Sequence, residues 1–188
     1  VSDSQAGKID PYKYLSFDQF DSIQLTLENV KFSILSANPI SDVHSSLIYI
    51  KAGSKSSVQM DNVIFNLNYT SSSQNILLVG QLNATDIRLN NISIFLSYTL
   101  NDKVPLWPLF AIQDQNILNL DSSIEASNIQ LSGKFENNLT SYIFQVFAIK
   151  YFSSATFTNL TLSNLKNIPS NGNLIDADGI QNLTLKDI

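Results

Sequence analysis

The stretch SVQMDNVIFNL, Ser57 to Leu67, recurs in recognisable form through most of the chain. Two short runs in which apolar and polar residues alternate, Val58–Met60 and Val63–Phe65, flank the polar pair Asp61-Asn62. The related copies are IQLTLENVKF from Ile23, DIRLNNISIF from Asp86, SIEASNIQLS from Ser123, ATFTNLTLS from Ala155 and NLTLKDI from Asn182. A repeat of this kind predicts a solenoid, in which each copy is one unit stacked on the next.

The polar residue at the centre of each copy sets the period. These hinge residues are Asn29, Asn62, Asn91, Asn128, Asn159 and Asp187, at intervals of 33, 29, 37, 31 and 28 residues. The drift of the interval indicates loops of variable length between constant coils. Asn tolerates the left-handed backbone conformation, so we expect the chain to bend at each hinge. Stacked hinges would lie ~4.8 Å apart, which allows their side chains to form a structural ladder of amide hydrogen bonds.

The two faces of these strands separate into apolar and polar sets, because residues two apart in a strand share a face. The inward columns before the hinge are Leu25, Val58, Ile87, Ile124, Ala155, Leu183 and Leu27, Met60, Leu89, Ala126, Phe157, Leu185. Those after it are Val30, Val63, Ile92, Ile129, Leu160, Ile188 and Phe32, Phe65, Ile94, Leu131, Leu162. The position between the first two columns is always polar: Thr26, Gln59, Arg88, Glu125, Thr156 or Thr184.

A further short apolar run precedes each hinge phrase and supplies another strand. These runs are Tyr14–Phe17, Leu47–Ile50, Ile76–Val79, Leu109–Ile112, Tyr142–Ile149 and Leu174–Ala177. We therefore predict an all-β, right-handed parallel β-helix of about six coils with three short strands per coil, the hand following from the preference of parallel crossovers. We expect residues 1–13 to be a polar lead-in or cap, and residues 14–188 to form the β-helix, which is expected to continue beyond the chain or to stack on a partner.

An antiparallel sandwich with ordinary surface turns is the alternative fold. Its hairpin turns would require Gly or Pro about every 8–12 residues, yet the chain has only six Gly and none at a hinge. The pattern instead resembles the right-handed parallel β-helix proteins of the pectate-lyase-like superfamily. In that superfamily a two-residue, Asn-bearing turn between the second and third strands is typical. The resemblance covers roughly residues 14–188 and implies the fold alone, because the superfamily includes lyases, hydrolases, adhesins and phage fibres.

Composition excludes several classes of function. Apolar residues make up 44% of the 188 and charged residues 14%, unlike a disordered chain. A net charge of −5 with one arginine, Arg88, argues against nucleic acid as a partner. No apolar run approaches the ~18–20 residues that membrane insertion needs. The absence of cysteine excludes disulfides and thiolate metal sites.

Grouped catalytic side chains, which acid–base chemistry requires, are not visible in the sequence. The single histidine, His44, and Arg88 lie on different segments, and we expect Arg88 to pair with Glu125 on the next coil. The motif around Asp176 and Asp178 lacks the further ligands of a calcium loop and is interpreted as a turn at Gly179. We therefore predict no catalytic, cofactor-binding or metal-binding residues, and no cofactor.

Six N-x-S/T sequons, at Asn68, Asn83, Asn91, Asn138, Asn159 and Asn182, mildly exceed the roughly four that composition alone gives. Glycosylation is expected at Asn68, Asn83 and Asn138, which fall in expected loops, with Asn182 added as a fourth candidate. Asn91 and Asn159 are hinge residues whose side chains the ladder would engage. Trp107, between Pro105 and Pro108, is the candidate ligand contact, unless it folds back onto the solenoid.

These features favour a non-enzymatic structural or adhesive protein, secreted to the extracellular space or cell surface, as a segment of a fibre or surface assembly. The expected partners are other protein chains, including copies of itself, through the open end of the β-helix, and carbohydrate. One alternative is a carbohydrate-active enzyme, a pectate-lyase-like lyase or hydrolase. Another is a carbohydrate- or partner-binding module that uses the loop around Trp107.

Overall fold

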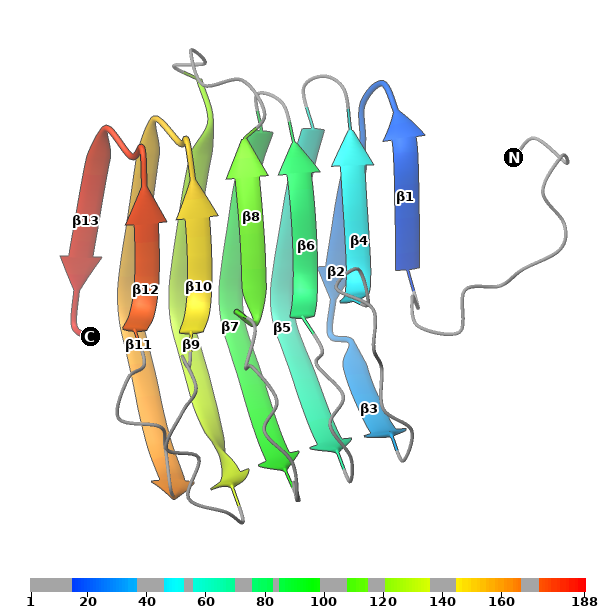
Figure 1. Ribbon diagram of the computed structural model, residues 1–188, viewed down its shortest axis with the longest axis vertical. Helices are drawn as coiled ribbons and strands as arrows, with labels where there is room; N and C mark the ends of the chain where they lie inside the picture. Colours follow the sequence, from blue (N-terminus) through cyan, green and yellow to red (C-terminus); the bar gives the residue numbers. More distant parts are fainter. Residues whose placement is uncertain are drawn as a thin grey trace, which may run out of the picture.

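A computed structural model describes residues 15–36, 46–52, 56–69, 76–82, 85–98, 108–114, 121–135, 145–166 and 173–188. The described residues form thirteen strands in two sheets, and every pairing is parallel (Figure 1). The first sheet has the order β1 (Leu15–Phe20), β4 (Ser46–Ala52), β6 (Ile76–Leu82), β8 (Phe110–Asp114), β10 (Gln145–Lys150) and β12 (Asn173–Asp178). The second has the order β13 (Asn182–Lys186), β11 (Ser154–Lys166), β9 (Ser123–Phe135), β7 (Thr85–Tyr98), β5 (Ser56–Tyr69) and β2 (Gln24–Glu28), with β3 (Lys31–Ser36) also beside β5.

The chain winds as a right-handed parallel β-solenoid. In Figure 1 it ascends through a strand of the first sheet at the front and descends through the second sheet behind, moving from right to left with each turn. Strands that are neighbours in a sheet therefore come from successive coils, and this confirms the predicted fold class and hand.

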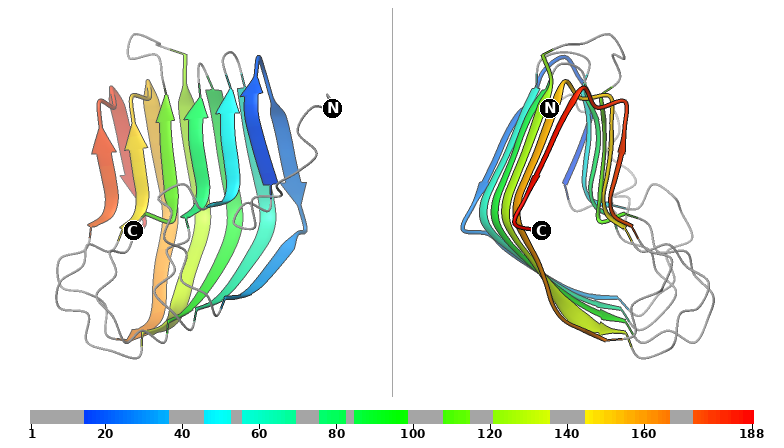
Figure 2. Two further views of the ribbon diagram at one scale, coloured as in Figure 1. Left: turned by 45° about the vertical axis from the view of Figure 1, so that its right-hand side comes forward. Right: turned by 90° about the vertical axis from the view of Figure 1, so that its left-hand side faces the viewer.

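The predicted division of each coil into three short strands is wrong in one respect. The two halves of the hinge phrase form one long strand of 13 or 14 residues in β5, β7, β9 and β11. The strand bends at the hinge, and the end-on view in Figure 2 shows that the second sheet makes two of the three sides of each coil. The strand continues because hydrogen bonding to the neighbouring coil resumes directly after the bend, as between β5 and β7.

The complete part of the solenoid is also shorter than the six coils expected. It amounts to about three coils, because the long strands β5, β7 and β9 are paired on both sides along their length. At one end the long strand is interrupted at Asn29–Val30, which separates β2 from β3. At the other end, β13 pairs only with the first half of β11.

The interior consists of the predicted apolar columns. In β5 the side chains of Val58, Met60, Val63, Phe65 and Leu67 are at most 1% exposed. Identical residues on neighbouring coils also stack through their aromatic rings. Phe110 and Phe147, on neighbouring strands of the first sheet, have ring centroids 4.8 Å apart and nearly parallel ring planes. Phe147 in turn meets Phe157 of the second sheet edge-on at 5.0 Å, which joins the two sheets.

Burial falls toward the ends of the solenoid. Leu25, Leu27, Val30 and Phe32 in the first coil are partly buried against the core. At the other end the inward residues Leu162, Leu183, Leu185 and Ile188 are 40–54% exposed. The columns were therefore assigned to the correct face, but the outermost residues lack a covering coil within the described residues.

Gly133 marks a close approach between β7 and β9. It occupies an inward position opposite Leu96, and a Cβ built there would lie 2.0 Å from the backbone oxygen of Leu96. Only glycine fits this position while the two strands keep their spacing.

Candidate functional site

All six hinge residues adopt the same backbone conformation. Their φ angles lie between 52° and 55°, in the left-handed region that Asn and Asp tolerate better than other side chains. The five asparagines are exposed on the outside of the bend, and so is Asp187. The chain therefore turns at equivalent points in successive coils, which lines these side chains up in a row along the solenoid.

Hydrogen bonds connect most of this row. The Nδ2 of Asn62 donates to Oδ1 of Asn29 at 2.6 Å, and the Nδ2 of Asn91 donates to Oδ1 of Asn62 at 3.3 Å. Further along, Asn159 donates to Asn128 at 2.8 Å. These contacts cross from coil to coil and use side chains that are exposed.

The row is interrupted between Asn91 and Asn128. The Nδ2 of Asn128 donates instead to Oδ1 of Asn90, at 3.0 Å. That oxygen also accepts the hydroxyl of Ser127 at 2.9 Å, while the Nδ2 of Asn90 donates to Asp61 at 2.9 Å. Asn90 precedes the hinge by one residue and offers a second amide acceptor beside Asn91. The ladder therefore changes column at β7.

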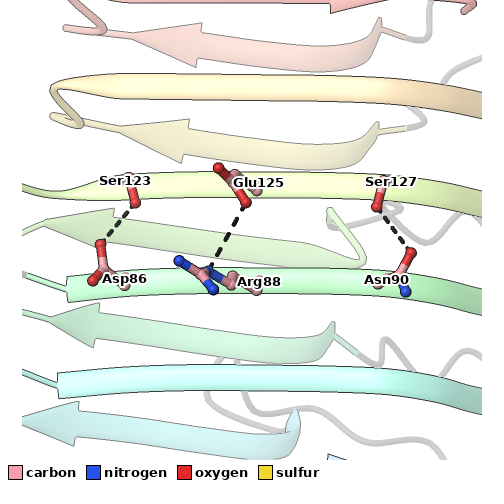
Figure 3. Close-up of polar contacts among 6 residues, drawn as sticks. All are labelled: Asp86, Arg88, Asn90, Ser123, Glu125 and Ser127. Atoms are coloured by element: carbon pink, nitrogen blue, oxygen red, sulfur yellow. Dashed lines mark hydrogen bonds and ion pairs between the residues drawn. The ribbon is translucent and has the colours of Figure 1, made fainter.

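The outer face before the hinge carries a second set of contacts between β7 and β9. Figure 3 shows three parallel pairs: Ser123 with Asp86 at 2.7 Å, Arg88 with Glu125 at 3.9 Å, and Ser127 with Asn90. The predicted pairing of Arg88 with Glu125 is thus confirmed. Both side chains are more than 60% exposed, so the ion pair contributes at most ~1 kcal/mol to stability.

A shallow pocket of about 300 Å³ lies at the point where the ladder is interrupted. It is lined by the hinge asparagines of β7, β9 and β11, by the residue two positions after each of them, and by Ile129, which lies between Asn128 and Gln130. The full lining is Asn91, Ser93, Asn128, Ile129, Gln130, Asn159 and Thr161. None of these side chains is charged. Two apolar side chains are exposed on the same outer face, Phe95 of β7 at 47% and Ile64 of β5 at 38%.

The glycosylation candidates are only partly covered by the structure. Asn68 was expected in a loop, but it lies within β5 with its side chain exposed, because the inward alternation continues as far as the buried Leu67. Asn182 is the first residue of β13 and is exposed, with its Nδ2 donating to the backbone oxygen of Ser153 at 3.4 Å. Several other predicted features lie outside the described residues: Asn83, Asn138, Trp107, His44 and the lead-in 1–13.

The acidic residues Asp176 and Asp178 of β12 take part in hydrogen bonds between neighbouring coils. Asp176 accepts a hydrogen bond from the side chain of Gln145 at 3.2 Å, and the backbone oxygen of Asp178 accepts one from the amide of Tyr151. The expected turn follows at Gly179, whose φ is 65°. Over the described ranges, no group of three or more His, Cys, Asp or Glu side chains is arranged to hold a metal ion. The same ranges contain no helix with the length and apolar character needed to cross a membrane.

Sequence reasoning missed three buried polar residues, of which Ser56 at the start of β5 accepts the amide of Ile23 through its hydroxyl. Asp114 at the end of β8 and Ser122 just before β9 are both 0% exposed. The signal for Asp114 was present, because it continues the inward alternation of Phe110 and Ile112. The backbone oxygen of Ser122 accepts the amides of Ser153 and Ser154 and the hydroxyl of Ser153, so this residue ties the start of β9 to the start of β11.

Comparison of the chain with protein-family models, with curated proteins and with solved structures finds no significant match.

Proposed function

We propose that this protein is a non-enzymatic structural or adhesive solenoid that assembles with other protein chains, copies of itself included, by adding coil to coil. The observation that carries the proposal is that β2 and β13 occupy equivalent positions in the repeat, so a first coil can be added in register to the coil whose apolar rim contains Leu183, Leu185 and Ile188. Strand β13 is paired on one side only within the described residues. An unpaired strand with exposed apolar residues favours pairing with a further strand.

The first coil of the same chain fits this rim in register. Counting across the paired strands places Thr26 and Thr184 in one column, so β2 (QLTLE) and β13 (NLTLK) are equivalent segments. Stacking a second copy in this register puts leucine on leucine twice. It also places Lys186 beside Glu28, whose charges are opposite. Like residues and opposite charges on neighbouring strands are the pairs that stabilise a sheet.

Sedimentation velocity over a range of concentrations tests this assembly. The 188-residue chain is expected to form species larger than the monomer as concentration rises. Leu185→Lys should shift the distribution to monomer, because a charge then replaces apolar contact at the rim. Ile64→Lys is the matched control, since Ile64 is also an exposed apolar residue but lies on the outer face of β5.

A charge exchange tests the register. Lys186→Glu should weaken association, and combining it with Glu28→Lys should restore it, because both residues are exposed and neither supports the core. A chain that stays monomeric at all concentrations contradicts the proposal. If neither Leu185→Lys nor Lys186→Glu changed the association, another surface would be responsible for it.

We also assign the chain to the pectate-lyase-like superfamily within this proposal. The supporting observations are the three-sided coil, the right-handed winding and the bend at an asparagine between two sides. The polar outer face with its ladder suits a rigid rod, because hydrogen bonds connect successive coils along it.

Secretion is the remaining part of the proposal and predicts a specific glycosylation pattern. In a eukaryotic host, Asn68 should carry a glycan because its side chain is exposed, together with the sequons at Asn83 and Asn138. Asn182 is the fourth candidate, because it is exposed and its Nδ2 donates to the backbone of Ser153 rather than within the ladder. Asn91 and Asn159 should remain unmodified, because their Nδ2 groups donate within the ladder. Glycopeptide mapping measures the occupancy of each site. Full occupancy at Asn91 would show that the ladder does not hold its amide.

A further inference from the structure

We propose that the pocket between the hinge residues of β7, β9 and β11 binds a neutral oligosaccharide. The site lies on the outer surface of the bend and is independent of the apolar rim that carries the assembly. The proposal depends on three properties of the described residues: solvent-accessible hydrogen-bonding groups that the ladder does not use, absence of charge, and an exposed aromatic ring beside the pocket.

The interrupted ladder leaves hydrogen-bonding groups available. Because Asn128 donates to Asn90, the Oδ1 of Asn91 accepts no hydrogen bond among the described residues. Amide and hydroxyl side chains surround it, with Ser93, Gln130 and Thr161 each two positions beyond a hinge. Each of these groups both donates and accepts, and a sugar hydroxyl requires the same combination.

The charge of the lining matches a neutral ligand. None of the seven lining residues is ionisable, so a phosphate or carboxylate ligand would meet no compensating cation in the pocket. An extended peptide is also disfavoured. Recognition of a peptide by strand addition needs a free sheet edge, and β7 and β9 are paired on both sides. The half of β11 beyond its hinge is paired only with β9 among the described residues, and a strand added there would lie beside the sheet rather than over the pocket.

Phe95 supplies an apolar surface next to these polar groups. It lies two residues after Ser93 on the same outer face of β7 and is 47% exposed. Its register neighbours are Asn66 and Ser132, so the ring is flanked by polar side chains. An aromatic face packs against the C–H face of a pyranose while nearby amides bind its hydroxyls, and this combination distinguishes a sugar from a purely polar ligand.

The dimensions limit the ligand to one or two sugar rings inside the pocket. A volume of about 300 Å³ is at the lower end of the range for small-molecule sites. Equivalent positions on successive coils repeat every ~4.8 Å along the solenoid, so a linear chain lying along this axis meets similar groups on each coil. The inference therefore specifies a short segment of an uncharged linear glycan.

The experiment uses the full chain produced in a host that does not add N-glycans. It is first screened against an array of neutral oligosaccharides of glucose, galactose, mannose and N-acetylglucosamine, with acidic oligogalacturonates as the charged comparison. Neutral members are expected to bind and the acidic ones not. Isothermal titration with the best neutral oligosaccharide then measures the effect of substitutions.

Phe95→Ser and Gln130→Ala are each expected to weaken binding by about fivefold or more. Arg88→Ala, on the outer face before the hinge, should leave affinity unchanged and controls for general surface effects. Lys186→Glu should also leave it unchanged, which separates this site from the assembly rim. Because Phe95, Gln130 and Arg88 are all exposed, thermal melts should match the parent protein.

Three results would overturn the proposal: no binding of any neutral oligosaccharide on the array, binding of acidic members alone, or unchanged affinity in both Phe95→Ser and Gln130→Ala. Binding lost only in Arg88→Ala would place the sugar on the outer face before the hinge, and this result would equally reject the proposed site.

Discussion

Met60→Asp is expected to prevent the chain from folding, whereas Gln59→Asp, one residue earlier, should leave stability almost unchanged. Met60 is 0% exposed, and its register neighbours on both sides, Leu27 and Leu89, are apolar. Burial of an unpaired carboxylate there should cost about 5 kcal/mol or more, comparable with the whole stability of a typical domain. Gln59 is exposed beside Arg88, so an aspartate there should change stability by no more than ~0.5 kcal/mol.

Thermal unfolding followed by circular dichroism measures this difference. The Gln59 variant should melt within a few degrees of the parent, and the Met60 variant should show no cooperative transition. Similar melting curves for the two variants would refute the assignment of the strand faces, since a shift of one residue exchanges every side chain between core and solvent.

The second large effect is expected at the hinge. Asn62→Val should lower the free energy of unfolding by about 2–3 kcal/mol, because a β-branched residue is strained at a φ of 52° and the two ladder contacts are lost. Asn62→Gly also loses the ladder contacts but accepts the left-handed conformation, so it should cost about 1 kcal/mol or less.

Urea denaturation of the three proteins gives both differences. The gap between the valine and glycine variants isolates the backbone contribution, and the loss in the glycine variant isolates the side-chain contacts. Equal stability of the valine and glycine variants would show that the left-handed bend does not account for the asparagine at this position.

Most of the fold was predictable because the same constraint recurs in every coil. A residue such as Val58 has an equivalent in each copy, so the inward columns could be assigned by alternation alone. The hinge asparagines were predictable for the same reason, since a left-handed bend restricts the choice of side chain. The continuity of the long strands was not predictable, because hydrogen bonding across a bend leaves no pattern in side-chain polarity.

The candidate site was less predictable because it depends on departures from the repeat. The pairing of Arg88 with Glu125 followed from the column they share, but the shift of the ladder at Asn90 required knowing which of two adjacent amides accepts the hydrogen bond. Gly133 gave no signal, since its role depends on the distance to the backbone of Leu96. Asp114 follows the inward alternation, but a carboxyl side chain is an unusual occupant of an inward position.

The parallel, in-register stacking of coils is tested most directly by disulfide trapping in this cysteine-free chain. Gln59 and Arg88 are 29 residues apart in sequence and are register partners on β5 and β7, while Glu125 is one strand further on. Neighbouring strands bring Cα atoms to ~4.8 Å, within disulfide range, but positions two strands apart are ~9.6 Å apart and cannot be bridged. Mild oxidation of the folded protein should therefore link Gln59→Cys with Arg88→Cys, and should leave Gln59→Cys with Glu125→Cys reduced. Failure of the first pair to form, or equal formation of both, would contradict the solenoid.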